Sequence, residues 1–206
     1  MTAQEPILIA SDIHGNLTCT LKLLRQGIDP SNIYILGDVL NNGESEKEAE
    51  IIDLIRKGGI NFLRGNHEDE FLEKYCGTSK ALARKKRKIG ISQKNRRFLR
   101  NSPTQYEFGK ILLIHTPISP RRVKTIETAV EGFNVIGNRD ICFHGHYHHP
   151  KAYSYNPRTG ECREEKSGTF QLKDNIQYLI NPGSLGINRT FLVYDPNKKT
   201  IRRYAF

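Results

Sequence analysis

The first part of the chain alternates short apolar runs with amphipathic stretches, and this alternation limits the fold more than any other feature. The apolar runs are too short for buried helices and have the length of buried strands. They lie at residues 6–12, 32–38 and 60–66. Between them, residues 16–27 and 44–59 have the pattern of helices, and the second begins with acidic residues and ends with basic residues before a glycine. Strands that alternate with helices predict an α/β fold.

The pattern changes after about residue 150, where strand-like segments follow one another with turns between them. Residues 67–100 look helical, with a break near Gly77, and residues 106–116 and 141–146 supply further strands. The later strand-like segments lie at 151–165, 168–172, 177–184 and 190–206. A chain of 206 residues can form one sizeable core. We therefore expect an α/β sandwich of mixed sheets that spans residues 1–206 as a single domain, with a basic helical insertion around 70–104.

Each apolar run is followed by a side chain that can bind a metal ion. These side chains belong to Asp12, His14, Asp38, Asn66, His115, His146 and His148. In α/β sheets, ligands bind beyond the carboxyl ends of the strands. Because residues i and i+2 of an extended chain point the same way, we expect Asp12 to act with His14, and His146 with His148.

The number and chemistry of these ligands indicate more than one metal ion. Seven ligands are too many for one catalytic metal with an open position, and they fit two metals that share a carboxylate. A mixture of carboxylate, imidazole and amide ligands favours Mn, Fe or Zn over Ca or Mg. We therefore expect two divalent cations, with Mn favoured and with Fe, Zn, Ni or Mg as alternatives.

Each motif also has an ordinary structural explanation when it is taken alone. Asp12, Asp38 and Asn66 could belong to turns or to a helix cap, and a lone His115 could be a core histidine. This explanation fails for the set, because five separate strand ends would each have acquired a ligand-type residue by chance.

Four of the seven histidines lie within residues 143–150, and two of them match no ligand position. His144 would point away from His146 on a regular strand, so we expect it in the core or behind the ligands. His149 has no place in the ligand set.

Taken in order, the motifs resemble the calcineurin-like metallophosphoesterase superfamily. Its pattern is Asp-x-His, Gly-Asp, Gly-Asn-His-Asp/Glu, a lone His and Gly-His-x-His, and this chain has them at residues 12–14, 37–38, 65–68, 115 and 145–148. The match extends from residue 7 to about 190. The stretches SDIHGNL, LGDVLNNG and INPGSLGINR resemble the small bacterial and archaeal phosphodiesterase-like branch. The resemblance implies an α/β/β/α sandwich of two mixed β-sheets flanked by helices.

The resemblance also implies a role for each site residue. Metal one would be held by Asp12, His14, Asp38 and His148, and metal two by Asp38, Asn66, His115 and His146. Asp38 would thus bridge the two metals. His67 would bind neither metal and would protonate the leaving group as a general acid. A hydroxide that bridges the metals would attack phosphorus in line.

The chain departs from the protein Ser/Thr phosphatase branch at two positions. That branch has an Asp and an Arg after its Gly-Asp motif, where this chain has Asn41 and Asn42. Phosphate would then be bound by the metals, His67, Asn42 and Arg189, with a plain surface arginine as the alternative for Arg189. We interpret Arg64 as a structural residue at a strand end. The stretch FLRGNHED nevertheless resembles the protein phosphatases closely.

These features favour a phosphoesterase that hydrolyses phosphodiester or phosphomonoester bonds, with a nucleotide or another phosphorylated small molecule as substrate. A Ser/Thr-type protein phosphatase and a dinucleoside polyphosphate hydrolase are the alternative enzymes. A nucleic-acid-binding protein and a non-catalytic scaffold on the same fold are alternatives of another class. The scaffold is disfavoured because every ligand position of the pattern is filled.

The positive charge of the chain is concentrated in residues 84–100, which contain nine Lys or Arg and no acidic residue. This segment accounts for most of the net charge of +10 and indicates a polyanionic partner or substrate. A solvated basic helix is the ordinary alternative. Phe98 is the only aromatic residue in the segment, and the chain has no nucleic-acid-binding motif.

The N-terminus shows no signal peptide, and no apolar run has membrane-spanning length. The four cysteines form no Cys-x-x-Cys pair. We therefore expect a cytoplasmic protein with reduced thiols and no membrane partner.

Overall fold

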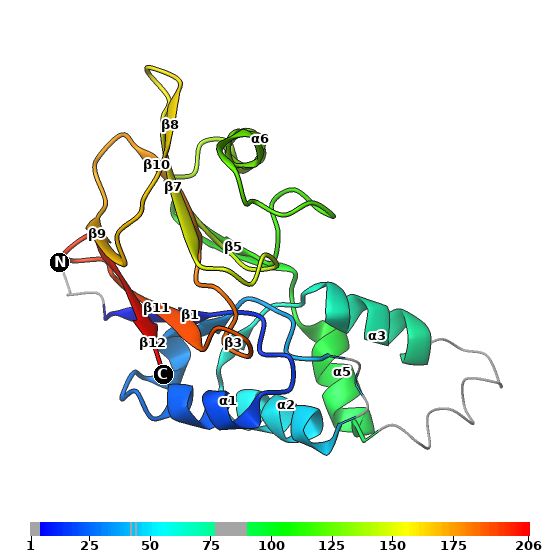
Figure 1. The fold of residues 1–206 in the computed structure, drawn as a ribbon. Helices are drawn as coiled ribbons and strands as arrows, with labels where there is room; N and C mark the ends of the chain where they lie inside the picture. The colour runs from blue at the N-terminus through cyan, green and yellow to red at the C-terminus, as the bar shows by residue number, and fades with distance from the viewer. Residues whose placement is uncertain (1–4, 42, 44, 77–89) are drawn as a thin grey trace.

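Two six-stranded mixed sheets lie at the centre of the protein, and helices cover their outer faces (Figure 1). This computed structural model describes residues 5–41, 43, 45–76 and 90–206. The first sheet contains, in spatial order, β3 (Asn61–Phe62), β2 (Ile33–Ile35), β1 (Ile7–Ala10), β11 (Thr190–Asp195), β12 (Thr200–Ala205) and β9 (Thr169–Gln171). The second contains β4 (Gln105–Phe108), β5 (Ile111–Ile114), β6 (Ile141–His144), β10 (Gln177–Asn181), β7 (Lys151–Asn156) and β8 (Glu161–Glu164). The α/β sandwich of two mixed sheets is confirmed.

The described helices divide unequally between the two sheets. Helices α1 (Leu17–Leu24), α2 (Glu46–Gly58), α3 (Asn66–Cys76) and α5 (Gln93–Asn101) share an apolar cluster with the first sheet. Helix α6 (Ile126–Ile136) packs on the second sheet through another cluster. A short 3₁₀ helix, η1 (Pro30–Asn32), leads into β2. None of the helices in the described ranges is both long and apolar enough to cross a membrane.

The core between the sheets explains why the early strands are apolar on both faces. Ile9 and Leu192 from the first sheet meet Phe143 and Ile180 from the second sheet in one buried cluster. The other face of β1 is covered by the helices, which is why Leu8 is also fully buried. A strand covered on both sides reads as a continuous apolar run.

Strand directions bring several carboxyl ends to one side of the sandwich. β1 pairs in parallel with β2, and β2 pairs in parallel with β3. In the second sheet, β6 runs parallel to both β5 and β10. Loops that leave these strands therefore emerge at common sheet edges, where residues distant in sequence can meet.

Some element boundaries differ from those expected. The segment 106–116 is a hairpin, because Gly109 takes a positive φ of 58° between β4 and β5. Strand β3 is only two residues long, since Asn66 already begins α3. The sequence interpretation had not assigned α6, although Thr125 and Thr128 form a capping box at its start. The expected break near Gly77 and residues 84–89 of the basic segment lie outside the described residues.

Candidate metal centre

The loops that follow β1, β2, β3, β5 and β6 converge on one place, which we call the metal centre. The backbone N–H of Asp12 donates to the carbonyl of Gly37, at 3.1 Å, and that of His14 donates to the carbonyl of Asp38, at 3.0 Å. In the second sheet, the N–H of Gly145 donates to the carbonyl of His115, at 2.9 Å. These bonds fix the loops from neighbouring strands against each other, so that their side chains face a common volume.

The backbone of the metal centre is strained at five of the seven predicted ligands. Asp12, His14, Asp38, His146 and His148 have positive φ values of 54°, 46°, 53°, 70° and 65°. A residue with a side chain loses roughly 1–2 kcal/mol in this left-handed region, and such strain gathers at functional sites. The prediction that paired ligands meet because the chain is extended is therefore wrong. Asp12 and His14 instead approach each other through tight left-handed turns, with 3.9 Å between Oδ1 of Asp12 and Nε2 of His14.

Three overlapping groups of side chains in the centre could each hold a metal ion. They are Asp12, His14 and His148; Asp38, His115 and His146; and His14, Asp38 and His67. In each group the potential ligand atoms lie within 4.8 Å of one another. The first two groups contain six of the seven predicted ligands, all but Asn66. The third group shares His14 with the first and Asp38 with the second, and it includes His67, which was expected to bind neither metal.

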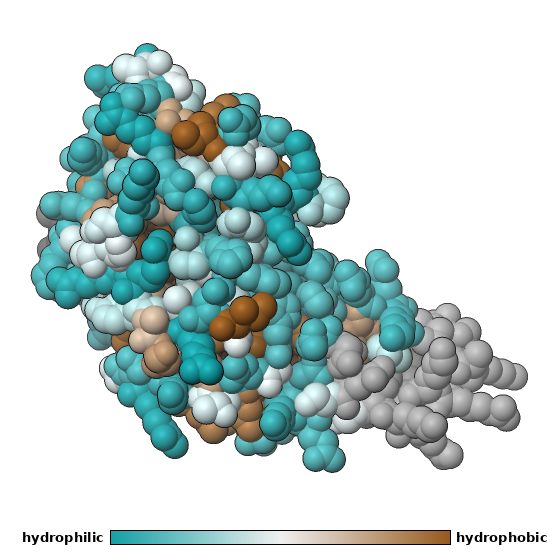
Figure 2. Space-filling view, viewed as in Figure 1, coloured by the Kyte–Doolittle hydropathy of each residue, from teal (hydrophilic) through white to brown (hydrophobic). Residues whose placement is uncertain are grey.

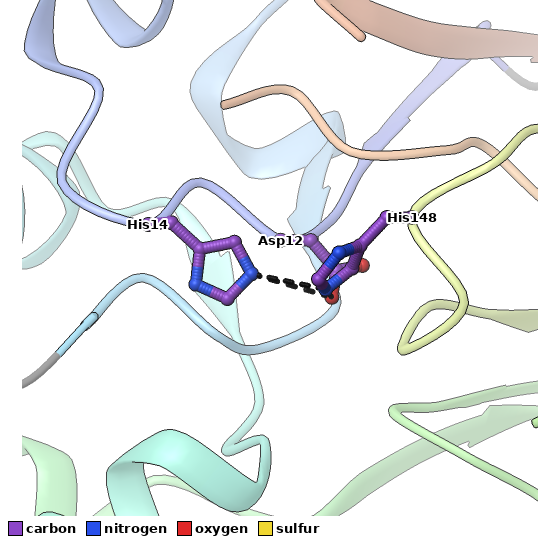
Figure 3. Close-up of side chains that lie close together, drawn as sticks. All are labelled: Asp12, His14 and His148. Carbon is purple, nitrogen blue, oxygen red and sulfur yellow. Dashed lines mark hydrogen bonds and ion pairs between the residues drawn. The ribbon is translucent and has the colours of Figure 1, made fainter. Parts of the chain in front are cut away.

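In the first group, a buried carboxylate faces two imidazoles (Figure 3). The Nε2 atom of His148 lies 3.3 Å from Oδ1 of Asp12 and 3.2 Å from Nε2 of His14. Oδ1 of Asp12 is buried and accepts no hydrogen bond from the described residues. An unpaired buried carboxylate oxygen is costly, so this arrangement calls for a cation.

In the second group, Asp38 and Asn66 converge on His115. The Nε2 atom of His115 lies 3.2 Å from Oδ2 of Asp38 and 3.0 Å from Oδ1 of Asn66. The ring of His146 lies 5.2 Å from that of His115, centroid to centroid. The group therefore offers one carboxylate, one amide oxygen and two imidazoles, which suits a divalent transition metal.

Backbone carbonyls determine which imidazole nitrogen is left for a metal. Nδ1 of His14 lies 3.2 Å from the carbonyl of Leu40, and Nδ1 of His115 lies 2.7 Å from that of Leu36. For His146 it is Nε2 that faces a carbonyl, that of Pro120, at 3.3 Å. Metal-binding histidines commonly donate their second ring N–H to such a carbonyl. The ring nitrogens that face no backbone carbonyl are thus Nε2 of His14 and His115, and Nδ1 of His146, and for His14 and His115 they point toward the other predicted ligands.

The ionisation of Asp38 and His115 reflects their close contact. Burial alone would raise the pKa of Asp38, but the hydrogen bond and the charge of His115 bring it down to about 2. Burial alone would lower the pKa of His115, but the hydrogen bond to Asp38 and its charge raise it to about 9. The carboxylate of Asp38 is therefore ionised at neutral pH, and the imidazole of His115 beside it is protonated. Burial lowers the pKa of His14 and of His146, which keeps both imidazoles neutral and able to bind a metal.

Glu68 supports the centre, although the sequence interpretation gave it no role. Its carboxylate is fully buried and accepts three backbone hydrogen bonds, from Asp38 at 2.8 Å, Leu40 at 2.9 Å and Gly65 at 2.9 Å. It thereby joins the loop after β2 to the loop after β3. Burial and the nearby Asp38 raise the pKa of Glu68 to about 7. The Gly-Asn-His-Glu motif was the sequence signal that could have revealed the role of Glu68. Gly65 of the same motif is required for space, because a Cβ there would lie 2.2 Å from Oδ1 of Asp38.

The stretch INPGSLGINR supports the centre from the opposite side. The hydroxyl of Ser184 donates to the carbonyl of Asp12, at 2.7 Å, and its N–H donates to the carbonyl of His148, at 2.8 Å. The side-chain amide of Asn181 donates to the carbonyl of Gly145, at 2.7 Å. This stretch therefore fixes the two loops that carry the first group.

His67 lies at the open side of the centre. Its Nδ1 is 2.8 Å from the carbonyl of Asn41, and its Nε2 is 3.9 Å from Oδ2 of Asp38. Its side chain is 29% exposed, and its ring lies 4.9 Å from that of His14. A substrate in solvent could therefore reach Nε2 of His67.

The structure does not test the two predicted phosphate-binding residues. Asn42 lies outside the described residues. Arg189 is exposed, and its carbonyl accepts a hydrogen bond from the N–H of Phe206, at 3.1 Å. Their role in binding phosphate stays a prediction.

His144 and Arg64 contact other groups of the protein, and His149 faces solvent. His144 is buried, with Nδ1 3.2 Å from the carbonyl of Gly145. His149 is exposed. The guanidinium of Arg64 pairs with Asp69, at 3.0 Å, and donates to the carbonyl of Arg100, at 2.9 Å.

Comparisons with known proteins agree with this geometry. The pattern of the calcineurin-like phosphoesterase family matches residues 5–150. An uncharacterized protein of Methanocaldococcus jannaschii, MJ0912, is 29% identical over 194 residues, which cover 87% of this chain and 76% of that protein. The Saccharomyces cerevisiae serine/threonine-protein phosphatase 2B catalytic subunit A2 is 34% identical over 127 residues, which cover 58% of this chain and 21% of that subunit.

The fold has a counterpart among solved structures. A metallophosphoesterase from Sphaerobacter thermophilus superimposes with a TM-score of 0.74 at 21% identity, and the match covers 97% of this chain and 86% of that one. The family pattern spans the loops after β1, β2, β3, β5 and β6, which carry every predicted metal ligand. This chain therefore belongs to the calcineurin-like phosphoesterase family.

Proposed function

We propose that this protein is a phosphoesterase that uses two divalent metal ions to hydrolyse phosphodiester or phosphomonoester bonds of small phosphorylated molecules, nucleotides among them. The observation that carries the proposal is the pair of ligand groups, one around Asp12 and one around Asp38, linked through a third group. A single structural metal would need only one closed group of ligands.

The residues fit two metals by their charge as well as by their position. Asp12 provides a buried carboxylate oxygen without a hydrogen-bond donor among the described residues, and Asp38 provides an ionised carboxylate between the groups. Asn66 adds a neutral amide, which limits the negative charge at a site that must accept an anionic substrate. When bound, two such cations would activate a water molecule as nucleophile and offset the charge on the phosphoryl oxygens.

His67 is the residue that we assign to the leaving group. Because Nδ1 of His67 faces a carbonyl oxygen, which can only accept a hydrogen bond, Nδ1 must carry a hydrogen atom and act as the donor. The imidazolium form then has a second proton on Nε2, toward the open side of the centre. His67 can therefore protonate a departing alkoxide, a step that typically contributes about 10²–10⁴-fold to the rate.

A protein phosphatase is the second candidate, and the local similarity to the yeast phosphatase subunit favours it. One departure favours a small substrate instead. This chain has Asn41 and Asn42 where that branch has an Asp and an Arg. Manganese as the preferred metal and a cytoplasmic location are parts of this proposal. Attraction of polyanions by residues 84–100 remains a prediction.

The decisive experiment measures turnover after the protein is stripped with a chelator and reloaded with Mn, Zn or Mg. Bis(p-nitrophenyl) phosphate, p-nitrophenyl phosphate and a phosphoserine peptide are compared at each metal. We expect metal-dependent hydrolysis of the nitrophenyl esters, fastest with Mn, and slow hydrolysis of the peptide. Failure to hydrolyse any phosphoester with any metal would overturn the proposal, and a preference for the peptide would favour the protein phosphatase.

A further inference from the structure

A cavity of about 360 Å³ opens beside His14, next to the first ligand group. It is lined by His14 and the residues that follow it up to Thr18, by Lys47 at the start of α2, and by Gly186 and Ile187 after β10. A phosphoryl group bound at the metal centre would thus have this cavity as its neighbour. The rest of the substrate needs such a space.

Lys47 gives the cavity its positive charge. It is the one Lys or Arg among the described residues that line the cavity, and it is exposed. No ion pair involves Lys47 within the described part of the chain, whereas Lys57 on the same helix pairs with Asp53, at 3.1 Å. The ammonium of Lys47 is therefore available to a ligand.

Ile187 gives the cavity an apolar wall. Its side chain is 59% exposed, which is unusual on a surface whose visible face is mainly hydrophilic with small separate apolar patches (Figure 2). Only three other large apolar side chains of the described residues are as clearly exposed: Ile126, Val135 and Tyr204. An apolar side chain held beside a charged site is a common feature of ligand pockets.

Both walls are fixed before any ligand arrives. The N–H of Leu185 donates to the carbonyl of Ser11, at 2.9 Å, and that of Gly186 donates to the carbonyl of Asp12, at 3.1 Å. The side-chain amide of Asn16 donates to the carbonyl of Gly186, at 2.9 Å, and so ties the two loops together. On the other side, a capping box between Ser45 and Glu48 anchors the start of α2. A preformed cavity loses less conformational entropy on binding.

We propose that this cavity binds the organic part of the substrate, and that Lys47 there binds a second phosphate group. The inference deepens the proposed phosphoesterase function and rests on it. The substrate class is an organic phosphate that carries one phosphate at the metal centre and another at some distance from it. Lys47 would form a charge-assisted hydrogen bond with the second phosphate, and Ile187 would contact the apolar part between the two groups.

The test compares two esters that differ only in the second phosphate. They are thymidine 5′-(p-nitrophenyl phosphate) and its 3′-phosphorylated analogue, assayed with Mn-loaded protein. We expect the 3′-phosphorylated ester to have the higher kcat/KM, and Lys47→Met to remove this preference with a loss of about tenfold for that ester, the size expected for one charge-assisted bond. The other ester should change less than about twofold. An equal loss for both esters, or no loss for either, would overturn the assignment.

Lys57→Met is the matched control, because it removes the same charge from an exposed position on the same helix. It should leave both esters unchanged. Ile187→Ser should raise KM for both nucleoside esters and spare p-nitrophenyl phosphate. Val135→Ser, at a site with a similar exposure of 57%, should affect none of them.

A binding measurement separates this inference from the proposed function. Isothermal titration calorimetry compares thymidine 3′,5′-bisphosphate with thymidine 5′-monophosphate on the Mn-loaded protein and requires no turnover. Tighter binding of the bisphosphate that is lost in Lys47→Met would support the subsite even if neither ester is hydrolysed. Equal affinities in the wild type and in Lys47→Met would reject the subsite, even if both esters are hydrolysed.

Discussion

The carboxylate of Glu68 accepts a hydrogen bond of 2.8 Å from the backbone N–H of Asp38. The same carboxylate binds the N–H groups of Leu40 and Gly65, so one buried side chain connects the second and third ligand loops. The position of Asp38 thus depends on a residue outside the predicted ligand set. Substitutions at the centre can therefore act in two ways. They can remove a predicted ligand such as Asp38, or they can remove a side chain such as Glu68 that holds the ligand loops in place.

Glu68→Gln should destabilise the protein and weaken metal binding. The amide NH₂ cannot accept hydrogen bonds, so at least one of the three backbone N–H groups is left buried without a partner, at a cost of roughly 1–3 kcal/mol. Chemical denaturation of the metal-free protein measures this cost, and metal titration measures the affinity. Glu70→Gln, at an exposed position on the same helix, is the control and should change neither. A fully stable Glu68→Gln protein with unchanged metal affinity would contradict the supporting role.

Asp38→Asn should lower both activity and metal content. The substitution removes the charge that lies between the two groups, while the side chain keeps nearly the same size. We expect fewer than one metal per chain after dialysis and a loss of turnover of at least about 10³-fold, since charge stabilisation by both metals is affected. Elemental analysis and kinetics on the same preparation measure the two effects. Asp140→Asn, an exposed aspartate, serves as control. Full activity in Asp38→Asn would rule out the shared carboxylate.

His67→Ala should retain both metals yet lose turnover. The expected loss is about 10²–10⁴-fold for alkyl phosphoesters, whose leaving groups need a proton. It should be smaller for p-nitrophenyl esters, because nitrophenolate leaves without one. Equal losses for both kinds of ester would count against the general acid, and loss of metal would place His67 among the ligands.

Asp53→Asn should reduce stability at neutral pH and much less at about pH 2. The hydrogen bond from Arg56, together with Lys57, lowers the pKa of Asp53 from 3.8 to about 2. A carboxylate with a depressed pKa in the folded state adds stability above its ordinary pKa and loses it as the pH falls through the lower value. The difference in unfolding free energy between wild type and Asp53→Asn should therefore shrink from pH 5 to pH 2. A difference that is independent of pH would show that the ionised carboxylate is not responsible.

The sequence determined the class of fold and predicted the ligand set. Short apolar runs separated by amphipathic segments indicate strands covered by helices, and together with the hairpin-like segments after residue 150 they predict a sandwich of mixed sheets. The ligands could be named because each follows such a run, at an edge where strand ends collect. The Thr125 capping box of α6 was a visible signal in the sequence, but α6 was not among the predicted helices.

Only the tertiary structure decided how the ligands meet and what lies around them. Asp12 and His14 were expected to pair through an extended backbone, but left-handed turns bring their side chains together. Lys47 and Ile187 carry no motif, and they line one cavity only because the fold brings α2 and the loop after β10 together near His14. Sequence patterns report local periodicity and residue chemistry, whereas such contacts depend on long-range packing. The hydrogen bond between Glu68 and Asp38 is of this second kind, since no periodicity links a buried carboxylate on α3 to a backbone N–H in the loop after β2.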